Sequence, residues 1–335
     1  MKAACVAREE AERAIRLLKS HDLLSRAHRP LQIGRKVCLP VLGEDAVSLL
    51  GKNGIEVEEK EVAFPEVQQR RTLRDLFPGV PSPTFVGDIA LFSWKREIPK
   101  ELYVEAAEVL LREMPRVNVA LLKVETWGEL RSQRVEHLAG EQRTRTVHKE
   151  YGLSFAVDLA KAYFNPRLAG EHRRVAEEVE RGEKVLDMFA GIGGHVIHIA
   201  ALKEAKVVAS DLNLEAVKLL AENVRLNQRR LRGEVAVIRA DASLLPRYLR
   251  PSFDRVIMDH PTASRYFARE ACQLLAGKGR IVYYTLTISC REAVEEALRE
   301  FSSCAVEVES CREVLDYSPS HSIFCLTLAA GGLRG

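Results

Sequence analysis

The sequence predicts an α/β protein whose C-terminal half is a doubly wound, Rossmann-like sheet with an antiparallel last strand. The first observation is a regular alternation of short apolar runs and helical segments after Lys184, the pattern of parallel strands joined by crossover helices. The second is that only a loop separates the last two runs, so we expect the final strand to run antiparallel. The runs read, in chain order, KVLDMFA, AKVVASD, GEVAVIRAD, DRVIMDH, GRIVYYT, AVEVES and SIFCLTLA.

The N-terminal half predicts two further parts. Ala11, Ala14, Ile15 and Leu18 form one helical stripe, and the segment RKVCLPVL follows as a short strand, which indicates a small αβ domain. The Pro- and Gly-rich stretch FPGVPSPT is typical of a linker. Beyond it, the strands FVGDIALFSW, VNVALLKVE and GLSFAVDLA and the helix ELYVEAAEVLLREM predict an α+β module. We therefore expect domains at residues 1–75, 76–180 and 181–335.

Composition indicates an ordinary globular chain, since 47% of its 335 residues are hydrophobic and its formal net charge is +3. No stretch approaches the run of about 20 apolar residues that a membrane span needs, and the N-terminus lacks the pattern of a signal peptide. We expect a cytoplasmic protein without a membrane partner. The small net charge says little about nucleic acid, because binding needs only a local basic face.

Seven cysteines are scattered without CxxC pairs, which indicates neither a zinc site nor a secreted disulfide framework. We therefore expect no bound metal, and the ordinary role of such cysteines is as small buried hydrophobes. Asn and Gln are sparse while Glu, Arg and Lys are plentiful, a composition typical of thermophiles, in which intracellular disulfides also occur. Pairing of the cysteines therefore stays open.

A glycine-rich turn follows the first predicted parallel strand, in the segment VLDMFAGIGGHVIHIA. Such a turn lets a ligand approach the backbone beyond the carboxyl ends of the strands. A dinucleotide site needs G-x-G-x-x-G, but the last of these positions is Val196, and no GKS or GKT is present for a P-loop. The turn therefore argues against a nucleotide-dependent oxidoreductase.

Three carboxylates at strand ends favour S-adenosylmethionine instead. Asp211 ends the second strand, where a carboxylate accepts both ribose hydroxyls, and Asp241 ends the third, near an adenine amino group. Asp187 precedes the glycines and is placed to face a cationic amino group. S-adenosylmethionine suits these three carboxylates, because it consists of adenosine with an ammonium and a sulfonium group and has no phosphate. We therefore expect a methyltransferase-type sheet. The expected cofactor residues are Asp187, Phe189, Ala190, Gly191, Gly193, Asp211, Leu212, Asp241 and Ala242.

The segment after the fourth strand, VIMDHPTASRYF, faces the reacting group in this architecture. Enzymes that methylate exocyclic amino groups commonly carry Asn/Asp-Pro-Pro-aromatic there. The corresponding run Asp259-His260-Pro261-Thr262 lacks the second proline and the aromatic residue. Amino methylation is therefore only weakly indicated.

Several stretches together resemble the archaeal and eukaryotic tRNA (guanine-37 N1)-methyltransferase family. They are RSQRVEHLAGE, TVHKEYGLSFAVDLAKAYFNPRLAGEHRRVAEEV, DMFAGIGGHVIHIA, GRIVYYT and the leading segment VAREEAERAIRLLKSHDLLSR. The resemblance spans nearly the whole chain. It implies a monomer with a leading domain that touches the tRNA body, a middle module, and an S-adenosylmethionine domain that methylates guanosine 37, next to the anticodon.

Two alternatives stay open beside that function. The family's wyosine-pathway relatives transfer a methyl or an aminocarboxypropyl group to a modified guanosine at the same site. A paralogue that binds tRNA without catalysis is the other alternative, although it would predict a defective cofactor pocket, whereas all three strand-end carboxylates are present.

The resemblance also implies roles for single residues. Loss of the guanine N1 proton calls for a general base, and the family's glutamate corresponds to Glu171. Charge on O6 calls for a cation, which corresponds to Arg131. Asp259 stands where the family has Asn, and an ionised carboxylate only accepts hydrogen bonds. Either Asp259 shares the base role with Glu171, or the target is a different guanosine derivative, or the chain binds tRNA but methylates poorly.

Further residues are expected to contact the substrate. Arginines should bind the tRNA backbone and steepen the salt dependence of binding. His148 and His172 lie near basic clusters, where each could contact phosphate, whereas His260 is expected to be packed or solvent-facing. Tyr283 or Tyr284 could stack on a base. The expected substrate residues are Arg143, Arg145, Tyr163, Arg167, Arg173, Arg174 and Pro261.

Overall fold

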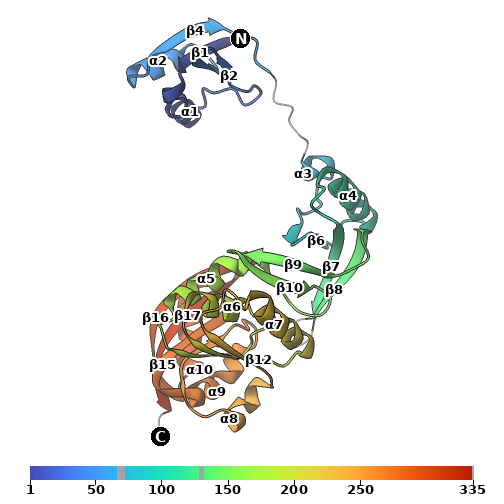
Figure 1. Ribbon diagram of the computed structural model, residues 1–335, viewed down its shortest axis with the longest axis vertical. Coiled ribbons are helices and arrows are strands. Elements are labelled where there is room, and N and C mark those ends of the chain that lie inside the picture. The colour runs from blue at the N-terminus through green and yellow to red at the C-terminus, as the bar shows by residue number, and fades with distance from the viewer. Residues whose placement is uncertain (66–71, 128–131, 334–335) are drawn as a thin grey trace. The chain divides into compact units, whose positions relative to one another are not determined.

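The computed structural model describes residues 1–65, 72–127 and 132–333, and the chain divides into two compact units, Met1–Asp75 and Leu76–Gly335. Figure 1 labels the elements of both units along the chain. Among the described residues, no helix is both long and apolar enough to cross a membrane.

The first unit is a four-stranded antiparallel sheet with two main helices, α1 (Ala11–Ser20) and α2 (Asp45–Lys52). Its strands lie in the order β2-β3-β1-β4. The stripe expected at Ala11, Ala14 and Leu18 is buried on α1 and packs in one core with Leu39 and Leu50. The strand bounds are β1 (Lys2–Ala7), β2 (Leu31–Ile33), β3 (Lys36–Pro40) and β4 (Val57–Glu61).

The second unit begins with a small mixed sheet in the order β5-β6-β7-β8. The sheet packs against helix α4, whose buried residues include Tyr103, Ala106 and Leu110. The short helix α3 (Leu73–Leu76) contains the boundary between the two units. The bounds of the other elements are β5 (Thr84–Val86), β6 (Ile89–Ser93), α4 (Lys100–Glu113), β7 (Val119–Trp127) and β8 (Ser132–Gly140).

A separate hairpin, β9 (Arg145–Glu150) with β10 (Leu153–Asp158), joins this sheet to the rest of the unit. Its loop is Tyr151-Gly152, with φ of 46° and 83°, because a two-residue turn that matches strand twist needs left-handed backbone. The free edge of β10 is paired by two buried side chains of α7 (Leu214–Asn227). Asn223 accepts from the Ala156 N–H at 2.6 Å, and Asn227 accepts from the Ser154 N–H at 2.9 Å. These amides hold the hairpin, and Glu150 at its turn, against the following helices.

The main sheet has the order β13-β12-β11-β14-β15-β17-β16. The first five strands in this order, β13, β12, β11, β14 and β15, pair in parallel. Strand β17 runs antiparallel to both β15 and β16. The predicted doubly wound sheet with an antiparallel last strand is therefore confirmed. The strands are β11 (Lys184–Asp187), β12 (Lys206–Asp211), β13 (Glu234–Arg239), β14 (Phe253–Met258), β15 (Leu275–Thr287), β16 (Cys304–Ser318) and β17 (His321–Leu333).

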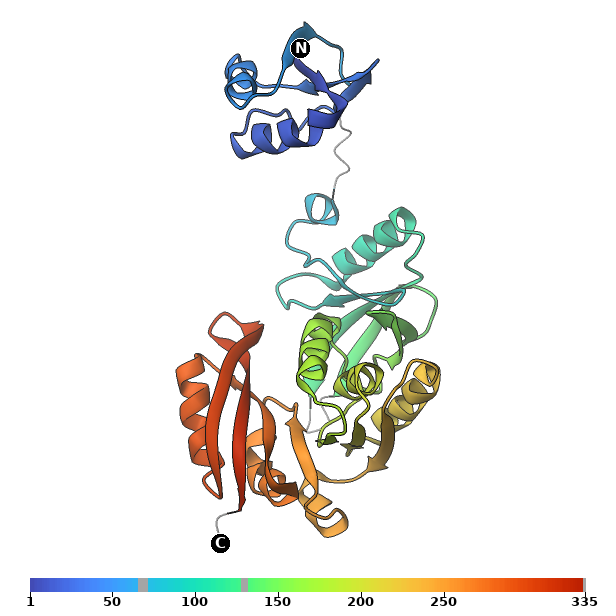
Figure 2. The same ribbon diagram turned by 60° about the vertical axis from the view of Figure 1, so that its left-hand side comes forward.

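Helices cover both faces of this sheet, as Figure 2 shows from a second side. One core joins the strands to α8, α9 and α10 through residues such as Leu274 and Phe301. The other joins them to α5, α6 and α7 through residues such as Val175, Val196 and Leu220. The helix bounds are α5 (Ala169–Glu178), α6 (Gly194–Leu202), α8 (Leu245–Tyr248), α9 (Ala268–Leu274) and α10 (Cys290–Glu300).

The cysteines correct an expectation from the sequence. Six of them form the disulfides Cys5–Cys38, Cys272–Cys304 and Cys290–Cys311, and only Cys325 is a free, buried thiol. The sequence left their pairing open, and the ordinary role of small unpaired hydrophobes does not hold for these six. The fold brings together partners that lie 21 to 33 residues apart in the sequence. Cys5 and Cys38, for example, are directly opposite one another on β1 and β3.

Candidate active site

A cavity of about 680 Å³ lies at the carboxyl ends of β11 to β14, where open α/β sheets bind their ligands. The glycine turn forms one of its walls. Gly191 and Gly193 have φ of 54° and 98°, a backbone that other residues rarely adopt, and a Cβ on Gly193 would collide with the Leu220 side chain. Glycine is therefore required at the turn that leads into α6.

The cavity is lined by most of the expected cofactor residues. Asp211 accepts hydrogen bonds from the N–H groups of Gly191 and Asn213, both at 2.8 Å, and so ties the glycine turn to the end of β12. Asp241 accepts from the Ser243 N–H at 2.9 Å and hydroxyl at 2.8 Å. The expected residues that line the cavity are Phe189, Ala190, Gly191, Asp211, Leu212, Asp241 and Ala242.

The other two expected residues, Asp187 and Gly193, do not line the cavity themselves. Asp187 directly precedes the lining residues Met188 and Phe189 and is almost completely buried at 1% exposure. It accepts one backbone hydrogen bond, from the Phe189 N–H at 3.1 Å, and forms no ion pair with a cation of the described chain. Burial raises the pKa of Asp187 well above its ordinary value, and the nearby charges of Asp259 and Asp211 raise it further. A cationic group bound in the cavity would reverse this shift, because it favours the ionised carboxylate.

These observations fit S-adenosylmethionine. Asp187 lacks a positive partner that the cofactor's ammonium group would supply. Asp211 and Asp241 present carboxylates to the cavity at neighbouring strand ends, where the ribose hydroxyls and the adenine amino group would bind. Apolar side chains such as Phe189, Leu212 and Ala242 also line the cavity and offer packing surface to a nucleoside.

Glu171, the expected general base, is buried in the first turn of α5 and is held by internal partners. Arg174 donates to both of its oxygens at 2.8 and 2.6 Å, and the Tyr284 hydroxyl donates at 2.9 Å. Burial alone would raise the pKa of Glu171, but the Arg174 guanidinium outweighs it and holds the pKa at about 2. Glu171 does not line the cavity, whereas its neighbours His172 and Tyr284 do.

Asp259, His260 and Pro261 follow the end of β14 and line the cavity. Asp259 Oδ2 lies 3.3 Å from His195 Nε2, and the Asp259 side chain is 20% exposed. The His260 ring packs edge-on against Phe189, with ring centroids 5.5 Å apart. Tyr163, another expected substrate residue, also lines the cavity.

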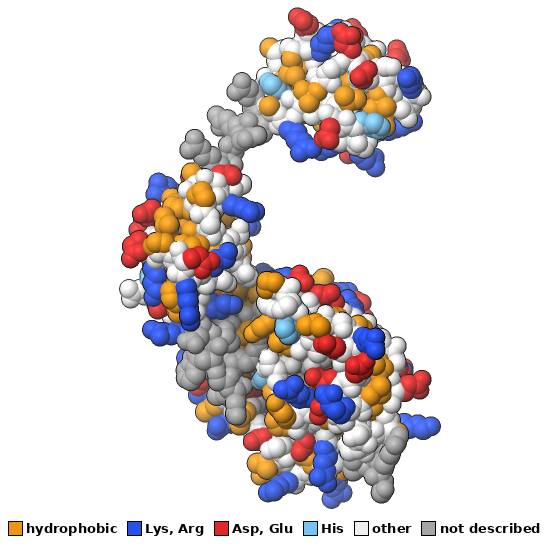
Figure 3. Space-filling view, turned by 180° about the vertical axis from the view of Figure 1, so that it is seen from behind, with side chains coloured by type: hydrophobic (Ala, Val, Ile, Leu, Met, Phe, Trp, Pro, Cys, Tyr) orange, Lys and Arg blue, Asp and Glu red, His pale blue; other side chains and the backbone are white. Residues whose placement is uncertain are grey.

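The expected arginines differ in what they contact. Arg143 pairs with Asp88, Arg145 with Glu222, and Arg173 with Glu177 at 2.8 Å. Arg174 also pairs with Glu178, so it serves as an internal partner of Glu171 rather than as a phosphate contact. Arg167 is exposed beside the cavity residues Asn165 and Leu168. On the face in Figure 3, Lys and Arg side chains are mixed with Asp and Glu side chains. Arg131, the expected cation near O6, lies outside the described residues.

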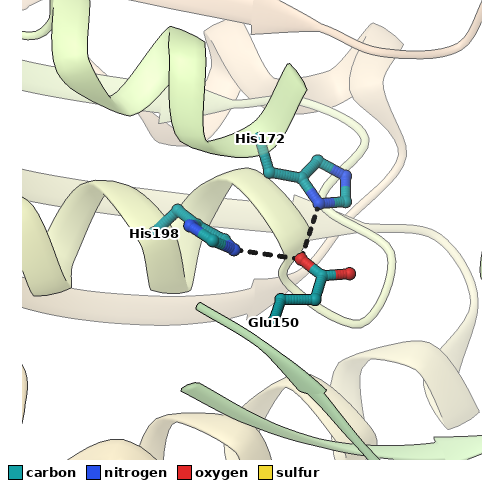
Figure 4. Close-up of side chains that lie close together, drawn as sticks. All are labelled: Glu150, His172 and His198. Carbon is teal, nitrogen blue, oxygen red and sulfur yellow. Dashed lines mark hydrogen bonds and ion pairs between the residues drawn. The ribbon is translucent and has the colours of Figure 1, made fainter. Parts of the chain in front are cut away.

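A cluster that the sequence did not predict lies next to the cavity. Glu150 Oε2 is 3.2 Å from His172 Nδ1 and 3.0 Å from His198 Nε2, and all three side chains are buried (Figure 4). His195, one turn before His198 on α6, packs 4.9 Å from the His172 ring. Two histidines three residues apart, directly after the glycine turn, were the signal that could have drawn attention to this region.

The fold and the strand-end carboxylates define the class of this protein, a Rossmann-like methyltransferase that uses S-adenosylmethionine. The family model for the TRM5/TYW2 methyltransferase domain matches residues 146–314. The chain is 31% identical to the tRNA (guanine(37)-N(1))-methyltransferase Trm5b of Methanocaldococcus jannaschii, over 95% of the chain and 96% of that protein. The chain therefore belongs to the TRM5/TYW2 methyltransferase family, and the family predicted from its motifs is confirmed.

The chain is also similar to a solved complex with tRNA and to a relative that acts on a wyosine precursor. The solved complex of aTrm5 with tRNALeu superposes with a TM-score of 0.69 at 28% identity, covering 98% of this chain and 99% of that one. The tRNA 4-demethylwyosine(37)-methyltransferase Taw21 of Saccharolobus solfataricus is 35% identical over 60% of the chain and 76% of that protein. The similarity thus includes both guanosine and wyosine-precursor enzymes.

Proposed function

We propose that the chain methylates N1 of guanosine 37 in tRNA with S-adenosylmethionine as the methyl donor. The observation that carries this proposal is the 31% identity to a tRNA (guanine(37)-N(1))-methyltransferase along almost the full length of both proteins. The wyosine-pathway relative covers a smaller share of the chain. The proposal includes action as a monomer in the cytoplasm, with residues 1–75 contacting the tRNA body.

The cofactor, when bound, supplies an electrophilic methyl group. Asp187, Asp211 and Asp241 would hold it by its ammonium, ribose and adenine groups. Tyr163 and Pro261, which line the same cavity, would contact the target base, and Arg167 offers an exposed cation for the backbone. Arg131 remains our candidate for the cation near O6.

Proton removal from N1 needs a base within reach of the cavity. Glu171 can accept this proton only after Arg174 releases at least one of its oxygens, because the double contact holds the carboxylate pKa at about 2. Asp259 already faces the cavity and lies beside His195. We therefore propose that Asp259 shares the base role with Glu171 and that Arg174 controls how basic Glu171 is.

The second candidate function is methylation of a wyosine precursor at the same nucleoside. One observation favours it, namely that Asp259 is a carboxylate where the family resemblance expects an amide. A carboxylate cannot donate to guanine O6, but it can accept from the altered edge of a tricyclic base. Transfer of an aminocarboxypropyl group is the other form of this alternative.

Nucleoside mass spectrometry separates these functions. Unmodified tRNA transcripts with guanosine or adenosine at position 37 are incubated with the protein and methyl-labelled S-adenosylmethionine. We expect labelled 1-methylguanosine from the guanosine transcript alone. Methyl label that enters only tRNA carrying a wyosine precursor would support methylation of that precursor. An unlabelled aminocarboxypropyl mass increase on the precursor would support the other form of the second function, because the labelled methyl then stays on the thioadenosine product. Neither product on any tRNA would indicate a binding paralogue.

A further inference from the structure

We propose that Glu150, His172 and His198 bind a divalent transition-metal ion of the Zn²⁺ type next to the methyltransferase pocket. The three side chains come from three elements, namely the end of β9, the first turn of α5 and the middle of α6 (Figure 4). This proposal does not depend on which nucleoside the enzyme methylates. It also departs from the sequence prediction of no bound metal, which rested on cysteine spacing.

The distances between the ligand atoms suit such an ion. Glu150 Oε2 is 3.2 Å from His172 Nδ1 and 3.0 Å from His198 Nε2, and the three atoms all lie within 4.8 Å of one another. Two zinc bonds of about 2.0–2.1 Å at a tetrahedral angle place their ligand atoms roughly 3.3–3.4 Å apart. Two of the three edges already have nearly this length, so small ring rotations complete the set. Two histidines and one glutamate are an established zinc ligand combination.

Among the described residues, the buried carboxylate of Glu150 lacks a permanently positive partner, which a metal ion would provide. The side chains of Glu150, His172 and His198 are 0%, 8% and 1% exposed. Within the described chain, Glu150 Oε1 has no hydrogen-bond partner, and neither Lys nor Arg pairs with this carboxylate. A buried negative charge with one unpartnered oxygen is costly, and a divalent cation would offset both deficits.

The glycine turn makes room for one of the ligands. A Cβ on Gly194 would lie 2.5 Å from both Cε1 and Nε2 of the His172 ring, so this ring rests directly on the backbone at the start of α6. Gly194 and His172 both line the pocket. His172 is therefore the member of the cluster that also lines the pocket.

A second group of possible ligands, His172 with His195 and Asp259, shares one histidine with the first. Asp259 is 20% exposed and already raises the pKa of Asp187 by its charge, which places it in the cofactor pocket. The group of Glu150, His172 and His198 is more deeply buried than the group that contains Asp259. Two of the distances between its ligand atoms are already short. We therefore assign the ion to Glu150, His172 and His198, with His195 beside the site but outside it.

An ion at this site would act on the position of Glu171. It would link the first turn of α5 to α6 and to the β9–β10 hairpin through His172, the residue that directly follows Glu171. The ion would thus be a structural clamp that holds the helix bearing the candidate base. No substrate atom needs to contact it.

The test is metal analysis of the full-length protein in the absence of tRNA. The protein is stripped with a chelator, titrated with Zn²⁺ and with Co²⁺, and examined by plasma mass spectrometry and by visible absorption of the Co²⁺ form. We expect one tightly bound ion per chain. His198→Gln keeps an N–H donor for Glu150 but removes a good ligand, so its affinity should fall roughly 100-fold. His195→Gln is the matched control, since His195 is equally buried on the same helix, and it should bind as the wild type does.

Three results would overturn the proposal. One is a wild-type chain that binds neither Zn²⁺ nor Co²⁺, a measurement that does not require any variant to fold. Another is binding lost in His195→Gln but kept in His198→Gln, which would place the ion at Asp259. The last is equal binding by both variants and the wild type, which would place it elsewhere.

Discussion

The cofactor pocket and the histidine cluster each bury a carboxylate, and the two differ in what surrounds it. Asp187, directly behind the pocket lining, has one backbone donor and no ion pair with a cation of the described chain, and its pKa is raised by burial. Glu150 in the cluster is held by two imidazoles, which outweigh the effect of burial and keep its pKa at about 2. The single backbone donor of Asp187 leaves a place for the ammonium group of the cofactor. The two imidazoles beside Glu150 join three elements of the fold and provide, together with the carboxylate, the donor atoms that we assign to a metal ion.

Glu171 is also a buried carboxylate with fixed partners, although it lies next to residues that line the cofactor pocket. Its pKa is also about 2, but its main partner is the permanent charge of Arg174 rather than histidine. The neighbouring residues Glu171 and His172 thus connect to different networks. This difference gives each carboxylate its own expected response to substitution and to pH.

The largest expected effect is on cofactor binding by Asp187→Asn. Removal of the charge that faces the cofactor's ammonium should weaken S-adenosylmethionine binding roughly 100-fold or more. The cofactor-free variant should be at least as stable as the wild type, because an unfavourably buried charge is gone. Calorimetric titration and urea unfolding measure the two quantities. Unchanged affinity would show that the ammonium binds elsewhere.

Arg174→Met should give the next largest effect, on stability and on the pH dependence of the rate. It leaves buried Glu171 with only the Arg312 guanidinium, 4.0 Å away, which should cost about 3 kcal/mol in unfolding free energy and raise the carboxylate pKa. If Glu171 is the base, the acidic limb of the pH–rate profile moves to higher pH.

The matched control for this variant is Arg173→Met. The ion pair of Arg173 with Glu177 is half-exposed, so its loss should cost about 1 kcal/mol or less. Equal stability losses in the two variants would refute the special role of Arg174.

Acid titration compares the two paired carboxylates directly. The folded-state pKa of Glu150 and of Glu171 lies at about 2, below the ordinary value of 4.5. Their contribution to stability is therefore fully present above about pH 4.5 and is lost as the pH falls through about 2. Urea unfolding between pH 2 and pH 6 should show a loss of a few kcal/mol, reduced in Glu150→Gln. A flat profile over this range would contradict the assigned pKa directions.

Asp241→Asn should have the smallest effect among these variants. The Asp241 carboxylate is partly exposed and already accepts from Ser243, so the change removes about one net hydrogen bond to the adenine, near 1 kcal/mol. S-adenosylmethionine affinity should fall roughly fivefold, measured beside Asp187→Asn. An effect as large as that of Asp187→Asn would remove the distinction between buried and exposed strand-end carboxylates.

Much of the pocket could be predicted from the sequence because its residues follow strand ends in order. Asp187, Asp211 and Asp241 each close an apolar run, and parallel strands bring their carboxyl ends to one edge. The histidine cluster could not be predicted this way. Glu150 is separated from its two partners by 22 and 48 residues, and no spacing rule joins a strand end to two different helices.

The pairing of Arg174 with Glu171 was open to prediction and was missed. The two residues are three apart on α5, a spacing at which side chains of a helix meet. The disulfides were not open to prediction, because seven scattered cysteines allow many pairings. The register of β1 and β3 selects Cys5–Cys38, whereas the packing of α9 and α10 against β16 selects the other two.

The most direct test of the central claim, that Asp187 awaits a cationic cofactor, is proton release when S-adenosylmethionine binds. Titrations at pH 5 to 7 in two buffers of different ionisation heat give the number of protons exchanged. Because burial raises the pKa of Asp187 in the free protein and a bound cation lowers it, binding should release protons, and affinity should fall as the pH decreases below that raised pKa. The release should disappear in Asp187→Asn. No release at any of these pH values, or a release that persists in the variant, would contradict the claim.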